Sequence, residues 1–349
     1  MGECRVEYRN LGRSGLKVSK LCLGAMMFGG PAAPEDGEAM IEEARTAGVN
    51  FIDTADGYNR GRSEEVVGQA VARDRDDWVI ATKLFNRMAE GPNGGGLSRK
   101  WTMRACEASL KRLGTDRIDL YYLHKEDPDT PLEETVRAMD DLIRAGKVLY
   151  YGVSNYRSWR VAEICRIADD LGAPRPIASQ PYYNAVNRMP ETEHLPACNW
   201  FGLGVVPYSP VARGVLTGKY RPGAEPETGS RAARGDRRIR ETELRDESLE
   251  VATKVVAHAG RRGMSAAQFA TLWVLNNRFV TSVIAGPRTR EQWQDYLGAM
   301  DHAFTAEDET LIDALVAPGH PSTPGYNDPQ YPVEGRPVWT AAPEQEALQ

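Results

Sequence analysis

Four side chains in this sequence could together protonate an oxygen atom: Asp53, Tyr58, Lys83 and His124. A free tyrosine has a pKa of about 10, which is too high for an efficient general acid near neutral pH. A nearby lysine ammonium favours the phenolate, and an aspartate beside that lysine keeps it charged and oriented. The histidine could hydrogen-bond a substrate carbonyl or relay the proton. This group therefore suits protonation of an oxygen while another reagent supplies a hydride.

Each of these residues also has an ordinary structural interpretation. Asp53 could cap the next loop, Tyr58 could be a loop aromatic, and the Asp56-Gly57 pair is typical of a turn. Lys83 could end in solvent, and His124 could be a hydrogen-bonded core residue. Catalysis is favoured because four compatible groups follow three successive strand-like runs.

The elements that must position these residues alternate between short β-rich runs and helical patterns. A hairpin is predicted at 7–11 and 16–19, turning at 13–15. Strands are predicted at 21–25, 51–54, 78–82, 118–123, 148–153, 177–180, 203–207 and 281–285. Helices are predicted at 34–47, 64–72, 98–113, 131–144, 158–171, 192–200, 249–262, 266–276, 290–300 and 306–316.

Strands separated by helical crossovers pair in parallel. Eight such units predict an α/β fold, the (β/α)8 or TIM barrel, whose active site lies at the C-terminal ends of the strands. A doubly wound sheet is the alternative, but the turn at 24–30 has its glycines without the G-x-G-x-x-G spacing. In the barrel, strands two, three and four are neighbours, so the four residues should converge on one patch.

A dinucleotide that donates hydride would need a phosphate site, which barrels usually build after strands seven and eight. Residues 286–290 follow the eighth run and open a helix, and the arginine fork of Arg288 suits a ribose 2′-phosphate. Tyr208, after the seventh run, offers a ring for stacking a flat cofactor head. A carboxamide could be hydrogen-bonded by Ser154 and Asn155, which follow strand five, and by Gln180 at the end of strand six.

Two segments fall outside the alternation. Arg221–Arg245 is charged and punctuated by glycine and proline, and its length makes it either a functional loop or a disordered segment. Ala317–Gln349 carries seven prolines and no periodicity. It is either a disordered terminus or an arm laid over the barrel mouth. The predicted organisation is one barrel domain over 1–316 and a tail over 317–349.

Composition excludes several classes of protein. The chain has 349 residues, of which 41 % are apolar and 26 % charged, and a formal net charge of -6, which argues against nucleic-acid binding. No apolar stretch approaches the roughly 20 residues of a membrane helix, and Met1–Asn10 has no signal-peptide core. Five widely spaced cysteines without C-x-x-C indicate reduced thiols rather than disulfides or a zinc site. We therefore expect a soluble cytoplasmic protein with no membrane partner and no metal.

The chain resembles the aldo-keto reductases over roughly residues 8–316. The matching stretches are Leu11-Gly12-Arg13-Ser14-Gly15-Leu16-Lys17-Val18-Ser19, Phe51-Ile52-Asp53-Thr54-Ala55-Asp56-Gly57-Tyr58, Gly152-Val153-Ser154-Asn155, Tyr208-Ser209-Pro210-Val211-Ala212-Arg213-Gly214-Val215-Leu216-Thr217-Gly218-Lys219-Tyr220 and Arg288-Thr289-Arg290-Glu291-Gln292. The resemblance implies a (β/α)8 barrel and NADPH-dependent reduction of aldehydes or ketones to alcohols.

The resemblance also implies roles for individual residues. Tyr58 matches the proton donor, Lys83 and Asp53 its supporting pair, and His124 the residue that orients the carbonyl. The positions implied to bind NADPH/NADP+ are Ala25, Met26, Asp53, Ser154, Asn155, Gln180, Tyr208, Ser209, Pro210, Val211, Ala212, Arg213, Lys219, Arg231, Gly286, Arg288 and Gln292. The loop that holds Arg231 would be the flap that closes on the pyrophosphate. Tyr296 stands where many relatives have an adenine-contacting Asn.

Two further functions are alternatives. One is a nucleotide-sensing regulatory subunit, because the potassium-channel β subunits share this barrel, but those relatives have Asn at the position of His124. A barrel hydrolase would need two catalytic carboxylates on strand ends, and only Asp53 stands there clearly.

The expected substrate is a small carbonyl compound, aromatic or aliphatic, with modified sugars or glyceraldehyde-type compounds as competitors. It would bind in a largely apolar mouth. The residues expected to line that mouth are Met27, Phe28, Tyr58, Phe85, Trp101 and His124.

Overall fold

The computed structural model describes residues 6–333, so residues 1–5 and 334–349 lie outside the described range. The last part of the tail predicted at 317–349 and Cys4 therefore fall outside it. The described cysteines Cys22, Cys106, Cys165 and Cys198 are free and buried. No helix in the described range is both long enough and apolar enough to cross a lipid bilayer.

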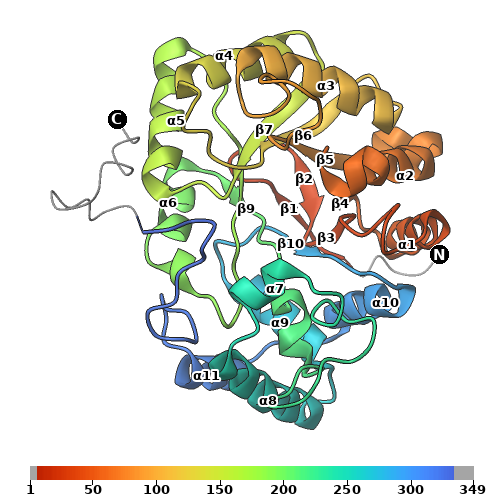
Figure 1. The fold of residues 1–349 in the computed structure, drawn as a ribbon, viewed down its shortest axis with the longest axis vertical. Coiled ribbons are helices and arrows are strands. Elements are labelled where there is room, and N and C mark those ends of the chain that lie inside the picture. Colours follow the sequence, from red (N-terminus) through yellow and green to blue (C-terminus); the bar gives the residue numbers. More distant parts are fainter. Residues whose placement is uncertain (1–5, 334–349) are drawn as a thin grey trace, which may run out of the picture.

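Parallel strands form the centre of the molecule, as the predicted barrel requires (Figure 1). The eight-stranded sheet has the order β10-β3-β4-β5-β6-β7-β8-β9. Its strands are β3 (Leu21–Gly24), β4 (Phe51–Asp53), β5 (Val79–Leu84), β6 (Ile118–Leu123), β7 (Val148–Ser154), β8 (Ala178–Gln180), β9 (Gly204–Val205) and β10 (Val283–Ala285).

The sheet closes on itself between its two outer strands. Single parallel bridges join Val205 to Val280 and Tyr208 to Ile284. The amide of Ile284 donates to the carbonyl of Pro207 at 2.9 Å, and that of Thr281 donates to Val205 at 2.8 Å. The seam pairs residues in bridges rather than in a long ladder, which is why β9 and β10 are shorter than the predicted runs 203–207 and 281–285.

A two-stranded antiparallel hairpin of β1 (Tyr8–Asn10) and β2 (Lys17–Ser19) precedes the barrel, as predicted. Its side chains Leu11 and Val18 are buried among the residues that fill the barrel interior. Gly12 lies at φ 60°, and a Cβ there would come within 2.4 Å of the Gly202 carbonyl oxygen. This close approach seats the hairpin against the barrel.

Helices cover the outside of the strands (Figure 1). They are α1 (Pro34–Ala47), α2 (Arg62–Val71), α3 (Arg99–Leu113), α4 (Leu132–Arg144), α5 (Ser158–Leu171), α6 (His194–Phe201), α7 (Arg237–Thr242), α8 (Asp246–Arg261), α9 (Ala266–Asn276), α10 (Arg290–Gly298) and α11 (Ala306–Leu315). Short 3-10 turns are η1 (Tyr58–Gly61), η2 (Ala72–Asp77), η3 (Met189–Glu191), η4 (Ala212–Thr217) and η5 (Ala299–Asp301).

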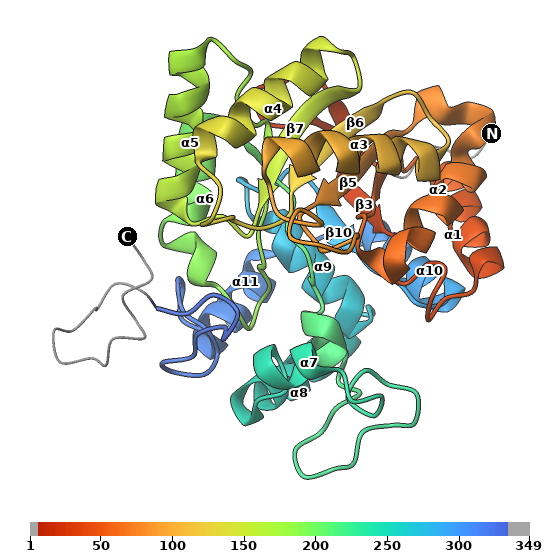
Figure 2. The ribbon, with the colours of Figure 1, turned by 45° about the horizontal axis from the view of Figure 1, so that its top comes forward.

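The predicted helices lie within a few residues of observed ones, and α7 is the helix of the described range that was not predicted. It lies inside the segment Arg221–Arg245, for which no regular element was predicted. Asp236 caps it by accepting from the amide of Ile239 at 3.2 Å. With only six residues, α7 is too short to show an amphipathic period. Figure 2 shows the long loop that precedes it standing away from the barrel.

The strands alternate between two separate cores, and this alternation aims the functional residues. Inward-facing side chains include Phe51 on β4, Ala81 on β5 and Tyr122 on β6. Their neighbours Ile52, Ile80 and Leu123 pack outward against the helices. Because side chains alternate along a strand, the positions two residues after the inward ones also face inward. Those positions are Asp53, Lys83 and His124.

Candidate active site

The ammonium group of Lys83 organises a buried polar cluster at the C-terminal ends of β4 and β5. Its Nζ donates to Asp53 Oδ1 at 2.5 Å and to the Thr54 carbonyl at 2.8 Å, and it lies 3.2 Å from the hydroxyl of Tyr58. Gln180 Nε2 donates to the other oxygen of Asp53 at 2.8 Å. Both charged side chains are almost completely shielded from solvent. The predicted convergence of Asp53, Tyr58 and Lys83 is present.

Tyr58 is held by the tight turn η1 rather than by a strand. The next residue, Asn59, lies at φ 48° and donates to the carbonyls of Met26 at 3.0 Å and Phe28 at 2.7 Å. These bonds tie η1 to the loop after β3. The Tyr58 ring then lies with its centroid 4.7 Å from Lys83 Nζ.

His124 completes the quartet at the end of β6. Its ring meets the ring of Tyr58 edge to face, with centroids 5.9 Å apart. Asn86 Nδ2 lies 3.3 Å from His124 Nδ1. An amide nitrogen only donates, so we assign Nδ1 as the acceptor and place the ring proton on Nε2.

The electrostatics of the quartet define which groups carry protons. Burial lowers the pKa of His124 well below its usual value, and Lys83 and Lys125 lower it further, so the ring is neutral at physiological pH. Burial also lowers the pKa of Lys83, but Asp53 and Tyr58 outweigh it and the net pKa is raised, which keeps the ammonium charged.

The pKa of Tyr58 is raised above its ordinary value, whereas the sequence predicted that it would be lowered. The lysine was expected to favour the phenolate, and it does lower the pKa of Tyr58, but burial raises that pKa by more. The phenol therefore carries a proton at neutral pH, although burial makes it a weaker acid than expected and the Lys83 ammonium offsets only part of that effect. Desolvation of the charged form wins because the hydroxyl lies inside the barrel mouth.

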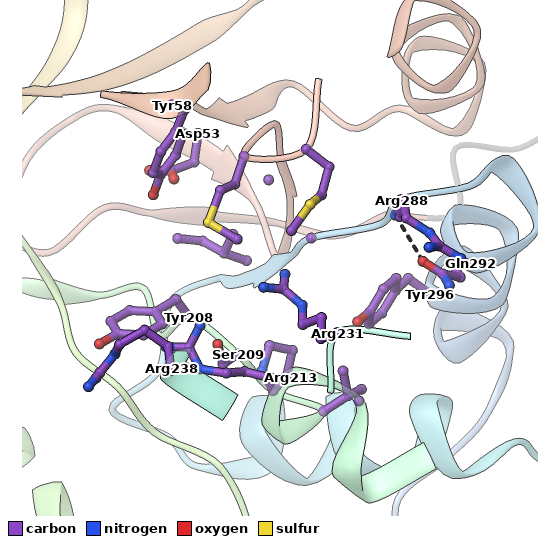
Figure 3. Close-up of a pocket in the computed structure, with 18 of the residues that line it drawn as sticks. Asp53, Tyr58, Tyr208, Ser209, Arg213, Arg231, Arg238, Arg288, Gln292 and Tyr296 are labelled. Atoms are coloured by element: carbon purple, nitrogen blue, oxygen red, sulfur yellow. Dashed lines mark hydrogen bonds between the residues drawn. The ribbon is translucent and has the colours of Figure 1, made fainter. Parts of the chain in front are cut away.

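A cavity of about 470 Å³ opens over this cluster. Figure 3 shows Tyr58 and Asp53 at one end and Arg288, Gln292 and Tyr296 at the other. Most residues expected to bind the cofactor line it: Met26, Asp53, Ser154, Asn155, Gln180, Tyr208, Ser209, Pro210, Val211, Arg213, Lys219, Arg231, Gly286, Arg288 and Gln292. Ala25 and Ala212 are completely buried beside it and do not line it.

Positive charge dominates the cavity wall. The cationic residues that line it are Lys125, Arg213, Lys219, Arg231, Arg234, Arg238 and Arg288. Burial lowers the pKa of Lys219, and Arg231 and Arg288 lower it further. Burial and Arg213 likewise lower the pKa of Arg231. Like charges held together at reduced hydration favour an anionic ligand, which would relieve their repulsion.

Backbone strain marks the middle of the cavity. Asn155, Ser209 and Arg213 have positive φ angles of 57°, 60° and 50°. Each such residue costs on the order of 1–3 kcal/mol. Asn155 also accepts from the hydroxyl of Tyr208 at 2.9 Å and donates to the carbonyl of His124 at 3.0 Å. These bonds connect Asn155, which was predicted to bind a carboxamide, to the ring of Tyr208 and to the strand end that carries His124.

The residues expected to form an apolar mouth divide into two groups. Met27, Tyr58 and His124 line the cavity. Phe28 and Trp101 do not, because both are buried in the core between strands and helices. Phe85 is partly buried against that same core and also lies outside the lining. The mouth is therefore less apolar than predicted.

Two segments form a cover over the cavity: the long loop 221–245 and the C-terminal segment 317–333. Arg288 donates to the Gly229 carbonyl at 2.6 Å, which ties the loop to the turn after β10. Arg238 of α7 binds both carboxylate oxygens of Asp328, at 2.9 and 2.5 Å. The interpretation of the tail as an arm over the mouth is confirmed at 330–331, where Gln330 and Tyr331 line the cavity.

Several lining residues were not predicted from the sequence. Lys125 follows His124 at a strand end, so its position alone could have identified it. Arg234 and Arg238 lie in the long loop, where the excess of arginine was the available signal. Gln330 and Tyr331 had no signal, because only the folded tail brings them to the mouth.

Comparison with known proteins agrees with this geometry. Residues 20–317 match the Aldo/keto reductase family. A "Probable voltage-gated potassium channel subunit beta" of Oryza sativa subsp. japonica is 39 % identical over 329 residues, covering 92 % of this chain and 100 % of the relative. The "L-glyceraldehyde 3-phosphate reductase" of Escherichia coli O157:H7 is 34 % identical over 330 residues, covering 90 % and 94 %. The "Uncharacterized oxidoreductase YrpG" of Bacillus subtilis is 35 % identical over 334 residues, covering 92 % and 99 %.

Proposed function

Because this chain belongs to the aldo/keto reductase family of oxidoreductases, we propose that it reduces aldehydes or ketones to alcohols with NADPH. The observation that carries the proposal is the 3.2 Å approach of the Tyr58 hydroxyl to a lysine ammonium that is itself paired with Asp53. The same cluster faces a cavity whose cationic wall suits a phosphorylated cofactor.

In this proposal each residue of the quartet has a separate role in the reduction of the carbonyl. His124 Nε2 donates a hydrogen bond that orients the carbonyl oxygen, and Tyr58 gives that oxygen its proton. The Lys83 ammonium stabilises the phenolate that remains, and Asp53 keeps the ammonium in place. NADPH, when bound, supplies the hydride. Proton donation by a positioned side chain typically contributes about 10²–10⁴-fold to the rate.

The residues that line the cavity fit the chemical groups of NADPH. Gln180 already uses Nε2 on Asp53, so its Oε1 remains to accept from a carboxamide, with Ser154 and Asn155 beside it. Tyr208 presents an aromatic ring for the nicotinamide. Lys219 and Arg231 would hold the pyrophosphate, and Arg288 the ribose 2′-phosphate. Tyr296 lines the far end of the cavity and offers a ring in place of the amide that many relatives carry.

A carbonyl panel assayed with NADPH and NADH side by side tests the activity. Aromatic and aliphatic aldehydes belong in it, and so does glyceraldehyde, since a relative is named for a glyceraldehyde phosphate. We expect turnover with NADPH and at least a hundredfold loss of kcat in Tyr58→Phe. Phe keeps the ring and removes only the proton donor. Wild-type rates in Tyr58→Phe would disprove this mechanism.

A second candidate is a nucleotide-sensing regulatory subunit, favoured by the similarity to the rice protein named as a channel subunit. In that case NADPH would bind, but aldehydes would be reduced slowly or not at all. Robust turnover by the purified chain, without any membrane partner, would count against this candidate. Tight NADPH binding with no turnover of the panel would support it.

A further inference from the structure

Lys125 is a cation in the cavity for which the steps above have no use. It follows His124 directly after β6, is only partly exposed, and lines the cavity. Its Nζ lies 6.0 Å from the centroid of the Phe85 ring. Among the described residues, no carboxylate forms an ion pair with it within 4.0 Å.

The surroundings of Lys125 leave its charge uncompensated. Arg238 lies close enough to lower the pKa of Lys125, although burial lowers it more. Asp328 is the nearby carboxylate that acts in the opposite direction, but both of its oxygens are bound to the guanidinium of Arg238. An anion bound near Lys125 could therefore form an ion pair with its ammonium without displacing an existing ion pair.

Lys125 belongs to the reacting end of the cavity. It adjoins His124 in sequence and lies close enough to lower the pKa of that imidazole. The residues proposed to hold phosphates, Arg288 and Lys219, come from other loops, and Figure 3 places Arg288 at the end opposite Tyr58. The Lys125 ammonium is thus better placed to bind a group on the substrate than to bind the cofactor phosphates.

We propose that Lys125 is a substrate-binding residue that recognises an anionic group, a carboxylate or a phosphate, on the carbonyl substrate. This proposal rests on the proposed function and refines it by naming the substrate class. Tyr331 and Gln330 form part of the same cavity wall, and their phenol and amide add hydrogen-bond donors to it. The preferred substrate is then a small aldehyde or ketone with a terminal negative charge.

Matched substrates and matched variants test this proposal. The substrate pairs are 4-carboxybenzaldehyde with neutral 4-nitrobenzaldehyde, and glyceraldehyde 3-phosphate with glyceraldehyde. The first pair tests a carboxylate and the second a phosphate. The variants are Lys125→Met, which keeps the chain length without charge, and Lys125→Arg, which keeps the charge. Lys111→Met, on the exposed last turn of α3, is the control.

We expect Lys125→Met to raise KM for the charged member of at least one pair on the order of tenfold to a hundredfold, as loss of a charge-assisted hydrogen bond would. The neutral members should change less than about twofold. Lys125→Arg should recover most of the loss, and Lys111→Met should behave as wild type. Equal effects of Lys125→Met on charged and neutral members, or no effect on either, would overturn the proposal.

Calorimetric titration of 4-carboxybenzaldehyde and of inorganic phosphate into the protein without cofactor separates the two proposals. Weaker binding of either probe to Lys125→Met than to wild type, even with no turnover of any aldehyde, would retain the anion site and reject the reductase. Turnover of the neutral aldehydes with no difference between these proteins in either binding or KM would retain the reductase and reject the anion site.

Discussion

The candidate catalytic edge, which consists of the strand ends that carry Asp53, Lys83 and His124 together with Tyr58, is built differently from the cover that lies over it. At the edge, Asp53 and Lys83 extend from neighbouring strands whose register pairs Asp53 with Ala81, two residues before Lys83. In the cover, Arg238 and Asp328 meet across 90 residues of sequence through a single ion pair. The edge is thus positioned by a ladder of backbone bonds and a close-packed interior, whereas the cover is positioned by side-chain contacts and by isolated backbone bonds, such as that from the amide of Ser322 to the Val186 carbonyl at 3.0 Å.

This difference separates two requirements of the site. Proton transfer needs groups held to within a fraction of an ångström, and strand ends supply that rigidity. Entry and exit of the proposed cofactor would need a segment that can open at low cost, and a cover held by isolated contacts rather than by a sheet ladder meets that need. Changes at the edge should therefore cost both stability and activity, while changes in the cover should affect mainly binding and local opening.

The largest effect is expected from Lys83→Met at the edge. The variant leaves the buried Asp53 carboxylate without its cation, and breaking such a pair typically costs about 3–5 kcal/mol. Urea unfolding should show this loss, and kcat for aldehyde reduction should fall by at least the factor seen for Tyr58→Phe. Lys111→Met should match wild type in both assays. A stable but inactive Lys83→Met would mean that the pair serves the chemistry alone.

The next effect concerns Asp56, which is buried directly beside the quartet. Burial and the nearby Glu64 raise the pKa of Asp56 to about 7, compared with about 3.9 in an unfolded chain. The folded protein holds this proton more tightly, so its stabilising contribution is complete below pH 4 and is lost as the pH rises to about 7.

Asp56→Asn should therefore be more stable than wild type at pH 8, on the order of 2–4 kcal/mol, with little difference at pH 4. Unfolding free energies measured from pH 4 to 8 test this. The exposed Asp116→Asn serves as the control. A constant difference across that range would show that Asp56 does not titrate there.

At the turn after β10, to which the cover is tied, Arg288→Leu should weaken NADPH binding about tenfold, because it removes the proposed contact to the 2′-phosphate. NADH, which lacks that phosphate, should bind nearly unchanged. Fluorescence titration of both cofactors measures this, with Arg278→Leu as the control. If both cofactors weaken equally, Arg288 acts through its bond to the Gly229 carbonyl and not through the phosphate.

The smallest effect is expected from Asp328→Asn, which removes the ion pair with Arg238. A partly exposed pair of this kind contributes about 1 kcal/mol or less, so global unfolding should barely change. Hydrogen exchange should instead become about fivefold faster in peptides from 317–333, while peptides from α4 remain unchanged. Added salt should bring wild type towards the variant. Unchanged exchange would mean that the cover is held by other contacts.

Much of the edge could be predicted because it follows from local rules. The alternation of Phe51, Ile52 and Asp53 already places the carboxylate on the inner face of a strand. Eight strand–helix units then leave few topologies, and the barrel brings consecutive strand ends together. The Lys83–Asp53 pairing was accessible in this way, although its distance and its completeness of burial were not.

The sequence by itself determined the order of the elements, the inward positions of Asp53, Lys83 and His124, and the resemblance that implied their roles. Only the tertiary structure decided that Phe28 and Trp101 belong to the core, that Tyr331 reaches the mouth, and that burial outweighs Lys83 in setting the pKa of Tyr58. The physical reason is range: periodicity and strand register act over a few residues. Burial and ion pairs between distant segments depend on everything that packs around a group.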